Sequence, residues 1–108
     1  MNCAAANKID LVDFLALLGF QPSKIRNIDY WYLSPFRNEK EPSFKVNRLK
    51  NLWYDHGLGK GGKTVDFAMI YFNCGLSGAL YKISLFHQQE QLKEASARRK
   101  KPAIDGKT

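Results

Sequence analysis

Two stretches of the 108-residue chain decide its fold: "SPFRNEKEPSF" at residues 34–44 and "WYDHGLGKGGKTVDF" at residues 53–67. Each combines a polar turn with aromatic residues that are typical of strands. Residues 43–47 alternate between apolar and polar side chains, which predicts a strand with one buried face. "LWYDH" at residues 52–56 predicts the next strand. The intervening "RLKN" favours a hairpin turn, so we expect the two strands to be antiparallel neighbours.

One helix and one strand are expected before these stretches. In residues 7–18 an apolar residue recurs every three or four positions, which predicts a helix capped by Asn7 and ended by Gly19. "QPSKIRN" at residues 21–27 is interpreted as a connection, and "YWYLS" at residues 30–34 as the first strand. The buried face of the helix would comprise Leu11, Phe14, Leu15 and Leu18.

Two more helices are expected after the glycine-rich loop at residues 57–63. Thr64 favours a helix start, and the residues that follow extend this helix to about Cys74, with Gly75 beyond it. Ser77 favours the start of the next helix. The order of one helix, three strands and two helices predicts an α+β domain on a small antiparallel sheet. Its predicted core includes Phe36, Phe44, Trp53 and Phe67.

The charge of the chain suggests a polyanionic partner. Hydrophobic residues make up 44% of the chain, so it is expected to fold, and the formal net charge is +7 with a pI of about 9.5. Residues 37–63 hold seven Lys and Arg against three Asp and Glu, and residues 93–108 hold six against two. The first excess indicates a basic folded surface, with nucleic acid as the first candidate partner, whereas the second indicates only a basic tail.

The cysteines and the hydropathy bear on the compartment. Cys3 and Cys74 stand alone, without the spacing of a metal or disulfide motif, which indicates free thiols in a reducing environment. No signal peptide and no apolar run of about 20 residues is recognisable. We therefore expect a cytoplasmic protein without a membrane partner.

A phosphate-binding loop is one alternative for the glycine-rich stretch. "GLGKGGKT" from Gly57 to Thr64 fits the pattern G-x-x-x-x-G-K-[ST], whose backbone N–H groups cradle phosphate. A nucleotide-hydrolysing domain, however, needs several parallel strands with crossover helices, and few residues follow this loop. The chance of a random match is also high among four glycines in six residues.

A second pattern links the two quoted stretches. Ser34 and Arg37 stand three apart, and Asp55 and Leu58 again stand three apart, at the positions of the four ligands in a C-x2-H/C-x2-C zinc ribbon. Together with "PF" after Ser34, "E-x-x-PSF" at 39–44 and "G-x-GG-x-x-V-x-F" at 59–67, this pattern resembles the N-terminal zinc-ribbon domain of DnaG-type bacterial primases. The resemblance covers about residues 9–86 and implies a zinc-ribbon-like sheet flanked by helices.

The zinc ligands of that family are three cysteines and a histidine, and none is present at these positions. We therefore expect a degenerate, metal-free zinc ribbon, in which Arg37 and Asp55 form an ion pair across the former site and Leu58 fills the rest with apolar contacts. A replacement site of Asp55, His56 and Cys74 is an alternative, although His56 should point to the opposite face of its strand.

The resemblance implies a non-catalytic module that contacts the single-stranded DNA template. The magnesium-binding carboxylates of the family lie in a separate catalytic domain, and no such cluster is recognisable here. Residues 1–92 are expected to form the domain, and residues 93–108 a basic polar tail or a linker to a downstream domain. The loss of the zinc ligands suggests a primase-like protein of a plasmid, phage or mobile element.

The residues themselves are consistent with DNA binding, since sites for single strands combine basic side chains with aromatic platforms. Tyr30, Trp31 and Tyr32 add aromatic residues on the first strand, although most aromatic residues are expected to belong to the core. The alternative is a protein-interaction module that docks on a replication helicase or polymerase. The predicted nucleic-acid-binding residues are Lys45, Arg48, Lys50, Tyr54, Lys60 and Lys63.

Overall fold

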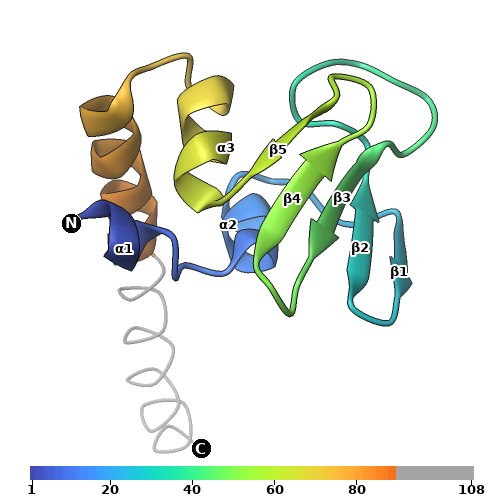
Figure 1. The fold of residues 1–108 in the computed structure, drawn as a ribbon, viewed down its shortest axis with the longest axis horizontal. Coiled ribbons are helices and arrows are strands. Elements are labelled where there is room, and N and C mark those ends of the chain that lie inside the picture. The colour runs from blue at the N-terminus through green and yellow to red at the C-terminus, as the bar shows by residue number, and fades with distance from the viewer. Residues whose placement is uncertain (90–108) are drawn as a thin grey trace, which may run out of the picture.

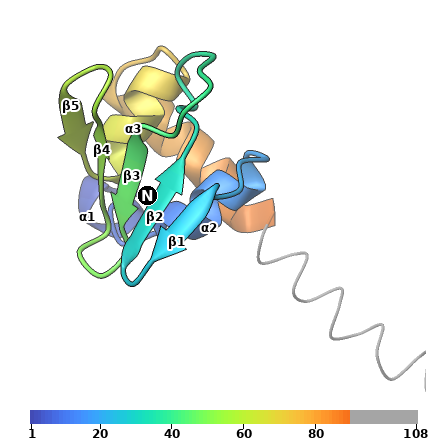
Figure 2. The ribbon, with the colours of Figure 1, turned by 90° about the vertical axis from the view of Figure 1, so that its right-hand side faces the viewer.

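The computed structural model describes residues 1–89, which form a five-stranded antiparallel sheet with helices on one side (Figures 1 and 2). The strands follow one another in chain order, β1-β2-β3-β4-β5, and every neighbouring pair is antiparallel. This confirms the predicted α+β class. The elements are α1 (Cys3–Ala6), α2 (Leu11–Leu17), β1 (Lys24–Arg26), β2 (Asp29–Tyr32), β3 (Phe44–Asn47), β4 (Leu52–Asp55), β5 (Lys60–Gly62), α3 (Thr64–Tyr71) and a last helix described over residues 76–89.

The three predicted strands correspond to β2, β3 and β4, and the hairpin between β3 and β4 is confirmed. The two outermost strands were not predicted. β1 lies in the stretch interpreted as a connection, and β5 lies within the glycine-rich loop. Both have only three residues and no residue of either is fully buried, so neither shows an apolar alternation. Their extended conformation follows from hydrogen bonding to a neighbouring strand, which local sequence does not reveal.

The helix predicted over residues 7–18 is confirmed as α2, but it begins at Leu11 and not near Asn7, because the chain bends between α1 and α2. Asp10 caps α2 in place of Asn7, and its carboxylate accepts a hydrogen bond from the Asp13 N–H at 3.0 Å. The Asn7 side chain instead accepts from the N–H of Val65 in α3, at 3.0 Å. Gly19 ends α2 as predicted, with a left-handed φ of 97°.

The boundaries of α3 also differ from those predicted. Lys63 occupies the N-cap position and Thr64 is the first helical residue, while the helix ends at Tyr71, before Cys74. The residue with left-handed backbone beyond it is Asn73, with φ 52°, in place of Gly75. Asparagine tolerates this conformation better than most residues, which explains the earlier end.

The β3–β4 turn holds the bend between α1 and α2 in place. Asn51 adopts a left-handed φ of 56° in this turn, and its side chain reaches the helical layer. It accepts a hydrogen bond from the Leu11 N–H at 2.8 Å and donates to the carbonyls of Asn7 and Ile9 at 3.1 and 2.9 Å. The backbone polar groups exposed by the bend are thereby satisfied.

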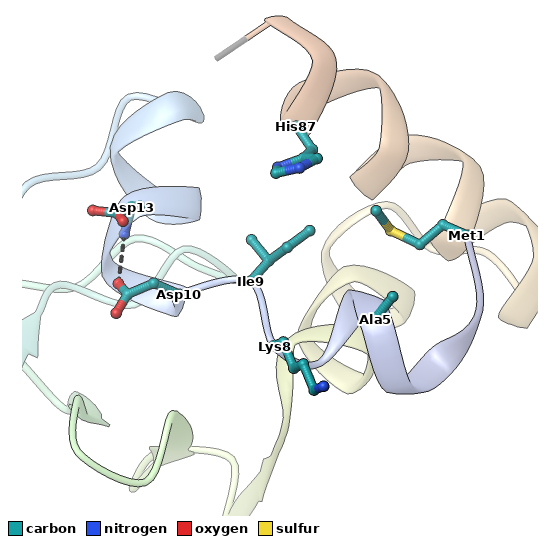
Figure 3. Close-up of a pocket in the computed structure, with 7 residues that line it drawn as sticks. All are labelled: Met1, Ala5, Lys8, Ile9, Asp10, Asp13 and His87. Carbon is teal, nitrogen blue, oxygen red and sulfur yellow. Dashed lines mark hydrogen bonds between the residues drawn. The ribbon is translucent and has the colours of Figure 1, made fainter. Parts of the chain in front are cut away.

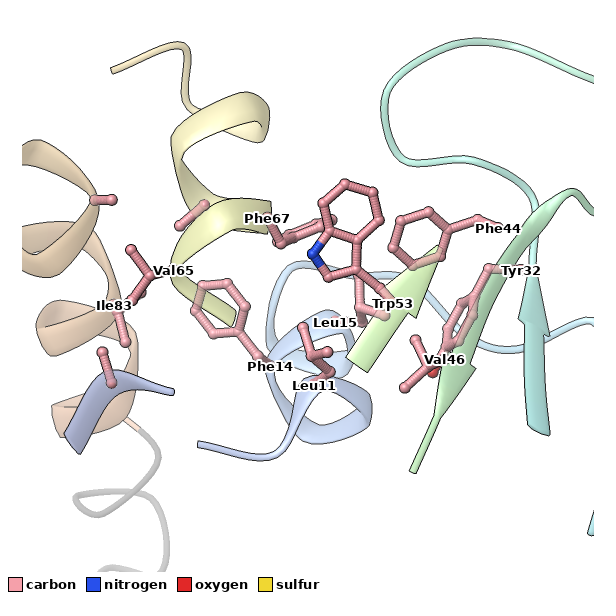
Figure 4. Packing of buried hydrophobic residues seen from close by; sticks show 13 residues of the cluster. Leu11, Phe14, Leu15, Tyr32, Phe44, Val46, Trp53, Val65, Phe67 and Ile83 are labelled. Atoms are coloured by element: carbon pink, nitrogen blue, oxygen red, sulfur yellow. The ribbon is translucent and has the colours of Figure 1, made fainter. Parts of the chain in front are cut away.

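Aromatic rings fill the space between the sheet and the helices (Figure 4). The rings of Phe44 and Trp53 stack at 5.4 Å, and Phe67 of α3 meets both edge-on. Phe36 contacts all three, so the predicted aromatic core is confirmed. Because Trp53 is buried, its indole N–H needs a partner, and it donates to the Lys63 carbonyl at 2.9 Å.

No helix within residues 1–89 is both long and apolar enough to cross a membrane. The predicted boundary between residues 92 and 93, and the basic tail that follows it, lie outside the described residues.

Candidate functional site

The four positions singled out as former metal ligands lie in two turns that the sheet brings together. Ser34 and Arg37 belong to the segment after β2, Asp55 is the last residue of β4, and Leu58 lies in the β4–β5 turn. The guanidinium of Arg37 binds both carboxylate oxygens of Asp55, each at 2.9 Å, which confirms the predicted ion pair. The Ser34 hydroxyl donates to the same carboxylate at 2.8 Å. The two turns are therefore joined by a polar cross-link.

Asp55 is the centre of this cross-link. Its side chain is fully buried, yet both oxygens have protein partners. Besides the contacts with Arg37 and Ser34, one oxygen accepts from the backbone N–H groups of Gly57 and Leu58 at 2.9 and 3.0 Å. The carboxylate thus shapes its own turn while it holds the other one.

Glu39 is a second acid in the network, and it was not among the predicted site residues. One oxygen accepts from Arg37 at 3.1 Å and from the Ser43 hydroxyl at 2.8 Å. The other accepts from the backbone N–H groups of Ser34 and Ser43 at 2.6 and 3.2 Å. Its position in the quoted "E-x-x-PSF" pattern was the available signal. The polar cross-link consists of Ser34, Arg37, Glu39, Ser43 and Asp55.

The remaining positions of the β4–β5 turn act through their backbone. A Cβ at Gly57 would overlap the guanidinium of Arg37, so glycine is required where the arginine passes. The Leu58 side chain is 44% exposed. The prediction that Leu58 fills the former site with apolar contacts is therefore wrong, and its contribution is the N–H donated to Asp55.

The residues present do not fit a zinc ion. A zinc ribbon needs four thiolate or imidazole ligands, whereas this site offers a serine hydroxyl, an arginine, a carboxylate already bound by donors, and a leucine. The alternative set of Asp55, His56 and Cys74 does not assemble. His56 stacks on Trp31 at 5.6 Å on the other face of the sheet from the buried Asp55, and within residues 1–89 no three His, Cys, Asp or Glu side chains form a metal-sized group.

The electrostatics of the cross-link favour its charged form. Burial alone would raise the pKa of Asp55, but the hydrogen bonds from Arg37, Ser34 and the Leu58 N–H outweigh it and lower that pKa. Burial would also raise the pKa of Glu39, but hydrogen bonds from Ser43 and Ser34 lower it. The hydrogen bond to Asp55 raises the pKa of Arg37. Both carboxylates therefore stabilise the fold as anions.

The opposite face of the sheet carries basic and aromatic side chains in one cross-strand row. Lys24 pairs with Trp31, Trp31 with Lys45, Lys45 with Tyr54, and Tyr54 with Gly61, so all five share one face. The ammonium groups of Lys24 and Lys45 each lie 5.7 Å from the centre of the Trp31 ring. We call Lys24, Trp31, Lys45 and Tyr54, together with the adjacent His56, the outer row.

Two of the predicted nucleic-acid-binding residues, Lys45 and Tyr54, are neighbours in the outer row. Lys50 is exposed in the β3–β4 turn, and Lys63 is exposed at the start of α3. Lys60 is exposed in β5, paired with Asp55 and so outside the outer row. Lys24, which belongs to the row, was missed because β1 was not predicted.

Arg48 is separated from this group. Its guanidinium forms ion pairs with Asp10 and Asp13 at 3.2 and 3.3 Å and donates to the Tyr30 hydroxyl at 3.1 Å. The hydrogen bond to Tyr30 raises the pKa of Arg48, whereas burial lowers it and the hydrogen bond to Asp10 raises it again. The net result is a raised pKa. Arg48 thus links the β3–β4 hairpin to the start of α2, and its charge is already partly compensated.

The structure contradicts the phosphate-loop alternative. Residues 57–64 contain β5, and several donors at the start of α3 already have partners within the chain. Thr64 donates its hydroxyl to the Ile9 carbonyl at 2.9 Å, and the Lys63 N–H is capped by the Asp66 carboxylate at 2.8 Å. A carboxylate at this helix start would repel a phosphate.

A hollow lies at the far end of the molecule, between α1, the start of α2 and the last helix (Figure 3). Asp10 and Asp13, which pair with Arg48, form one of its walls. This acidic wall makes it a poor site for a polyanion, in contrast to the outer row. Its lining residues are Met1, Ala5, Lys8, Ile9, Asp10, Asp13 and His87.

Comparison with known proteins identifies the family of the chain. The family model of the CHC2 zinc finger, the zinc ribbon of DnaG, matches residues 4–99. The chain belongs to the CHC2 zinc-finger family. It is 36% identical to a DNA primase of Legionella pneumophila over 68% of this chain, and 30% identical to a DNA primase of Escherichia coli over 87%.

These primases are far longer than the region that this chain matches. The chain covers 12% of the Legionella protein and 15% of the Escherichia coli protein. A crystal structure of the zinc-binding and RNA polymerase domains of Aquifex aeolicus primase superposes with a TM-score of 0.63, over 75% of this chain and 20% of that chain. At 24% identity this likeness shows the fold alone. The chain therefore corresponds to the zinc-finger domain of its family.

The polar cross-link predicts a specific loss of stability in acid. Because the pKa values of Asp55 and Glu39 are lowered by folding, their contribution is complete above their unfolded values and is lost as pH falls through the folded ones. We expect the free energy of unfolding, measured by urea titration, to be flat near neutral pH and to fall below about pH 5.

Two single substitutions separate this effect from general acid unfolding. Asp55→Asn should be less stable at neutral pH and show a shallower pH dependence, whereas Glu41→Gln, at an exposed position nearby, should follow the parent. If the free energy of unfolding of Asp55→Asn depends on pH with the same slope as that of the parent, the proposed role of the carboxylate is contradicted.

Proposed function

We propose that the chain is a single-stranded DNA template-binding module of a primase-like replication protein, and that it works without zinc. Family membership supports the assignment to the primase zinc ribbon. A primase catalytic domain would belong to a longer protein. The proposal allows for one because this chain covers only 12% of the Legionella pneumophila primase. The missing zinc ligands also motivate the proposal that this protein comes from a plasmid, phage or mobile element.

The outer row is the observation that carries the proposal. Single-stranded nucleic acid is bound by aromatic rings that stack on bases and by cations that contact the backbone. Trp31 and Tyr54 alternate with Lys24 and Lys45 across four strands, and Tyr54 is 41% exposed. Lys50, Lys60 and Lys63 would extend the basic surface around the row. Arg48 would contribute mainly through the hairpin that it anchors.

The polar cross-link supports the proposed metal-free state. In a small domain structural zinc joins two turns and supplies much of the folding free energy. Here an arginine, two carboxylates and two serines join the same turns by direct hydrogen bonds. The guanidinium suits this task because it can bind carboxylates bidentately and keeps its charge.

Docking on a replication helicase or polymerase is a second candidate, and one observation favours it. Ile28 in the β1–β2 turn and Leu49 in the β3–β4 turn are exposed at 42% and 78%, and the two turns meet through the hydrogen bond from the Arg48 N–H to the Ile28 carbonyl. Exposed apolar side chains at adjacent turns can form a protein contact. Protein docking there would depend weakly on salt, unlike DNA binding.

The DNA-binding proposal is tested by fluorescence anisotropy with a labelled single-stranded oligonucleotide at two salt concentrations. We expect binding in about the micromolar range at low salt that weakens as salt rises, because a small module neutralises few phosphates. Tyr54→Ala should reduce the affinity roughly tenfold, since stacking contributes about 1–3 kcal/mol per base. Lys45→Gln should weaken binding and reduce its salt dependence.

Matched controls come from the last helix, away from the outer row. Tyr81→Ala and Lys82→Gln change exposed residues of the same types and should bind like the parent. Deletion of residues 96–108 should weaken binding less than the changes in the row. If Tyr54→Ala and Lys45→Gln bind like the parent while the deletion abolishes binding, the shaped-site proposal is wrong.

Metal independence is tested by elemental analysis and by restoring the family's ligands. We expect well below one zinc per purified chain, and a chelator should leave the melting temperature unchanged. The variant with Ser34→Cys, Arg37→His, Asp55→Cys and Leu58→Cys should bind about one zinc and become sensitive to chelator, because it regains a C-x2-H/C-x2-C ligand set. Stoichiometric zinc in the parent would refute the metal-free proposal.

A further inference from the structure

Strand β1 forms one edge of the sheet, and part of its backbone has no strand to pair with among the described residues (Figure 1). The Ser23 N–H donates to the Trp31 carbonyl at 2.7 Å, so the backbone polar groups of Trp31 face β1. In an antiparallel ladder these directions alternate along a strand. Those of Tyr30 therefore face β3, and those of Ile25, which pairs with Tyr30 in the register, point away from the sheet.

The side chains of β1 are accessible as well. All three of its residues are exposed, and Ile25 is 55% exposed. Lys24 and Arg26 flank Ile25 and share the outer face, because side chains alternate along a strand. The Lys24 ammonium lies over the Trp31 ring, and no ion pair of Lys24 or Arg26 is formed within residues 1–89, although Asp29 is the cross-strand partner of Arg26. Both cations are therefore available to a ligand.

We propose that the β1 edge binds an extended acidic segment of a partner protein by strand addition. The backbone of such a strand pairs with the N–H and the carbonyl of Ile25. Because side chains alternate between the faces of a sheet, two of its residues lie on the face of Lys24 and Arg26, and the residue between them lies on the face of Ile25. The cations select carboxylates at the two outer positions, and Ile25 selects an apolar residue between them.

A second copy of this chain fits the edge poorly. If two β1 strands paired antiparallel about Ile25, Lys24 of each would face Arg26 of the other, and like charges directly opposite destabilise a strand pair. The other edge of the sheet is less selective, because Gly61 and Gly62 of β5 offer no side chain that could choose a partner. An acidic segment is thus the occupant that the charges of β1 favour.

Nucleic acid is the other polyanion that these cations could meet, since Lys24 also belongs to the outer row. A phosphate backbone, however, carries no N–H and carbonyl groups in strand register to pair with Ile25, and no alternation of acidic and apolar groups. The test therefore uses a peptide whose alternation can be broken without a change of charge.

The probe is the synthetic peptide Asp-Val-Asp-Val-Asp with blocked ends, added to the isotope-labelled full chain and followed by NMR. We expect saturable shifts of the Ile25 amide with a Kd of roughly 0.1–1 mM, because a short flexible strand must be ordered on binding. The peptide Val-Val-Asp-Asp-Asp has the same composition but cannot place carboxylates on one face and valine on the other. It should bind roughly fivefold more weakly.

Variants of the chain test the charges and the backbone separately. Lys24→Glu with Arg26→Glu should lose the acidic peptide and bind Lys-Val-Lys-Val-Lys in its place, because opposite charges then face each other again. Lys60→Glu with Lys63→Glu, at the other edge, changes the net charge equally and should keep the preference of the parent. Ile25→Pro removes the outward N–H and should weaken binding roughly tenfold, whereas Ile25→Val should bind like the parent.

The outcomes separate strand addition from general attraction to a basic protein. An inverted peptide preference in the variant with Lys24→Glu and Arg26→Glu, but not in the control, supports the proposal. If both peptides bind equally, or if the two charge reversals weaken binding equally, strand addition is refuted. If a single-stranded oligonucleotide shifts the Ile25 amide and neither peptide does, the edge belongs to nucleic acid and the proposal is refuted. The proposed DNA binding is judged separately, through Lys45 and Tyr54.

Discussion

The buried carboxylate of Asp55 is the constraint on which the rest of the structure depends. A fully buried anion is strongly destabilising unless it is paired and hydrogen-bonded. Here Arg37, Ser34 and two backbone N–H groups of its own turn bind it. Those contacts fix the end of β4 against the segment that leads into β3. The arginine in turn requires Gly57, and Glu39 completes its coordination, so the whole arrangement forms as a unit.

This arrangement separates the structural face of the sheet from the proposed binding face. Alternation along β4 sends Trp53 and Asp55 inward and Tyr54 outward. The inward side chains hold the core and the polar cross-link, which leaves the outer row free to carry cations and exposed rings. In the proposed metal-free state, the polar cross-link would take the place of the metal without altering the opposite face. Stability would then depend on the ionisation of these carboxylates and no longer on metal supply.

Much of this architecture could be predicted from sequence, because the strongest patterns are local. The alternation in residues 43–47, the hairpin turn and the aromatic core residues were correctly predicted, as was the pairing of Arg37 with Asp55 from ligand spacing. β1 and β5 could not be predicted, since their strand conformation depends on partners distant in sequence. The bend before α2 was missed because the hydrogen bonds that stabilise it are made by the Asn51 side chain, forty residues from Leu11. Glu39 was overlooked for a similar reason: its role appears only when Arg37 and Ser43 are brought to it.

The central claim is that Arg37 and Asp55 act together in place of a metal ion, and a double-mutant cycle measures this most directly. Arg37→Met, Asp55→Asn and the double variant would be unfolded by urea at neutral pH in the presence of a chelator. Each single change leaves part of a paired charge without its partner, so the account predicts that the double variant loses less stability than the two single losses combined. Strictly additive losses would show that the two residues do not stabilise the fold as a pair, and would contradict the account.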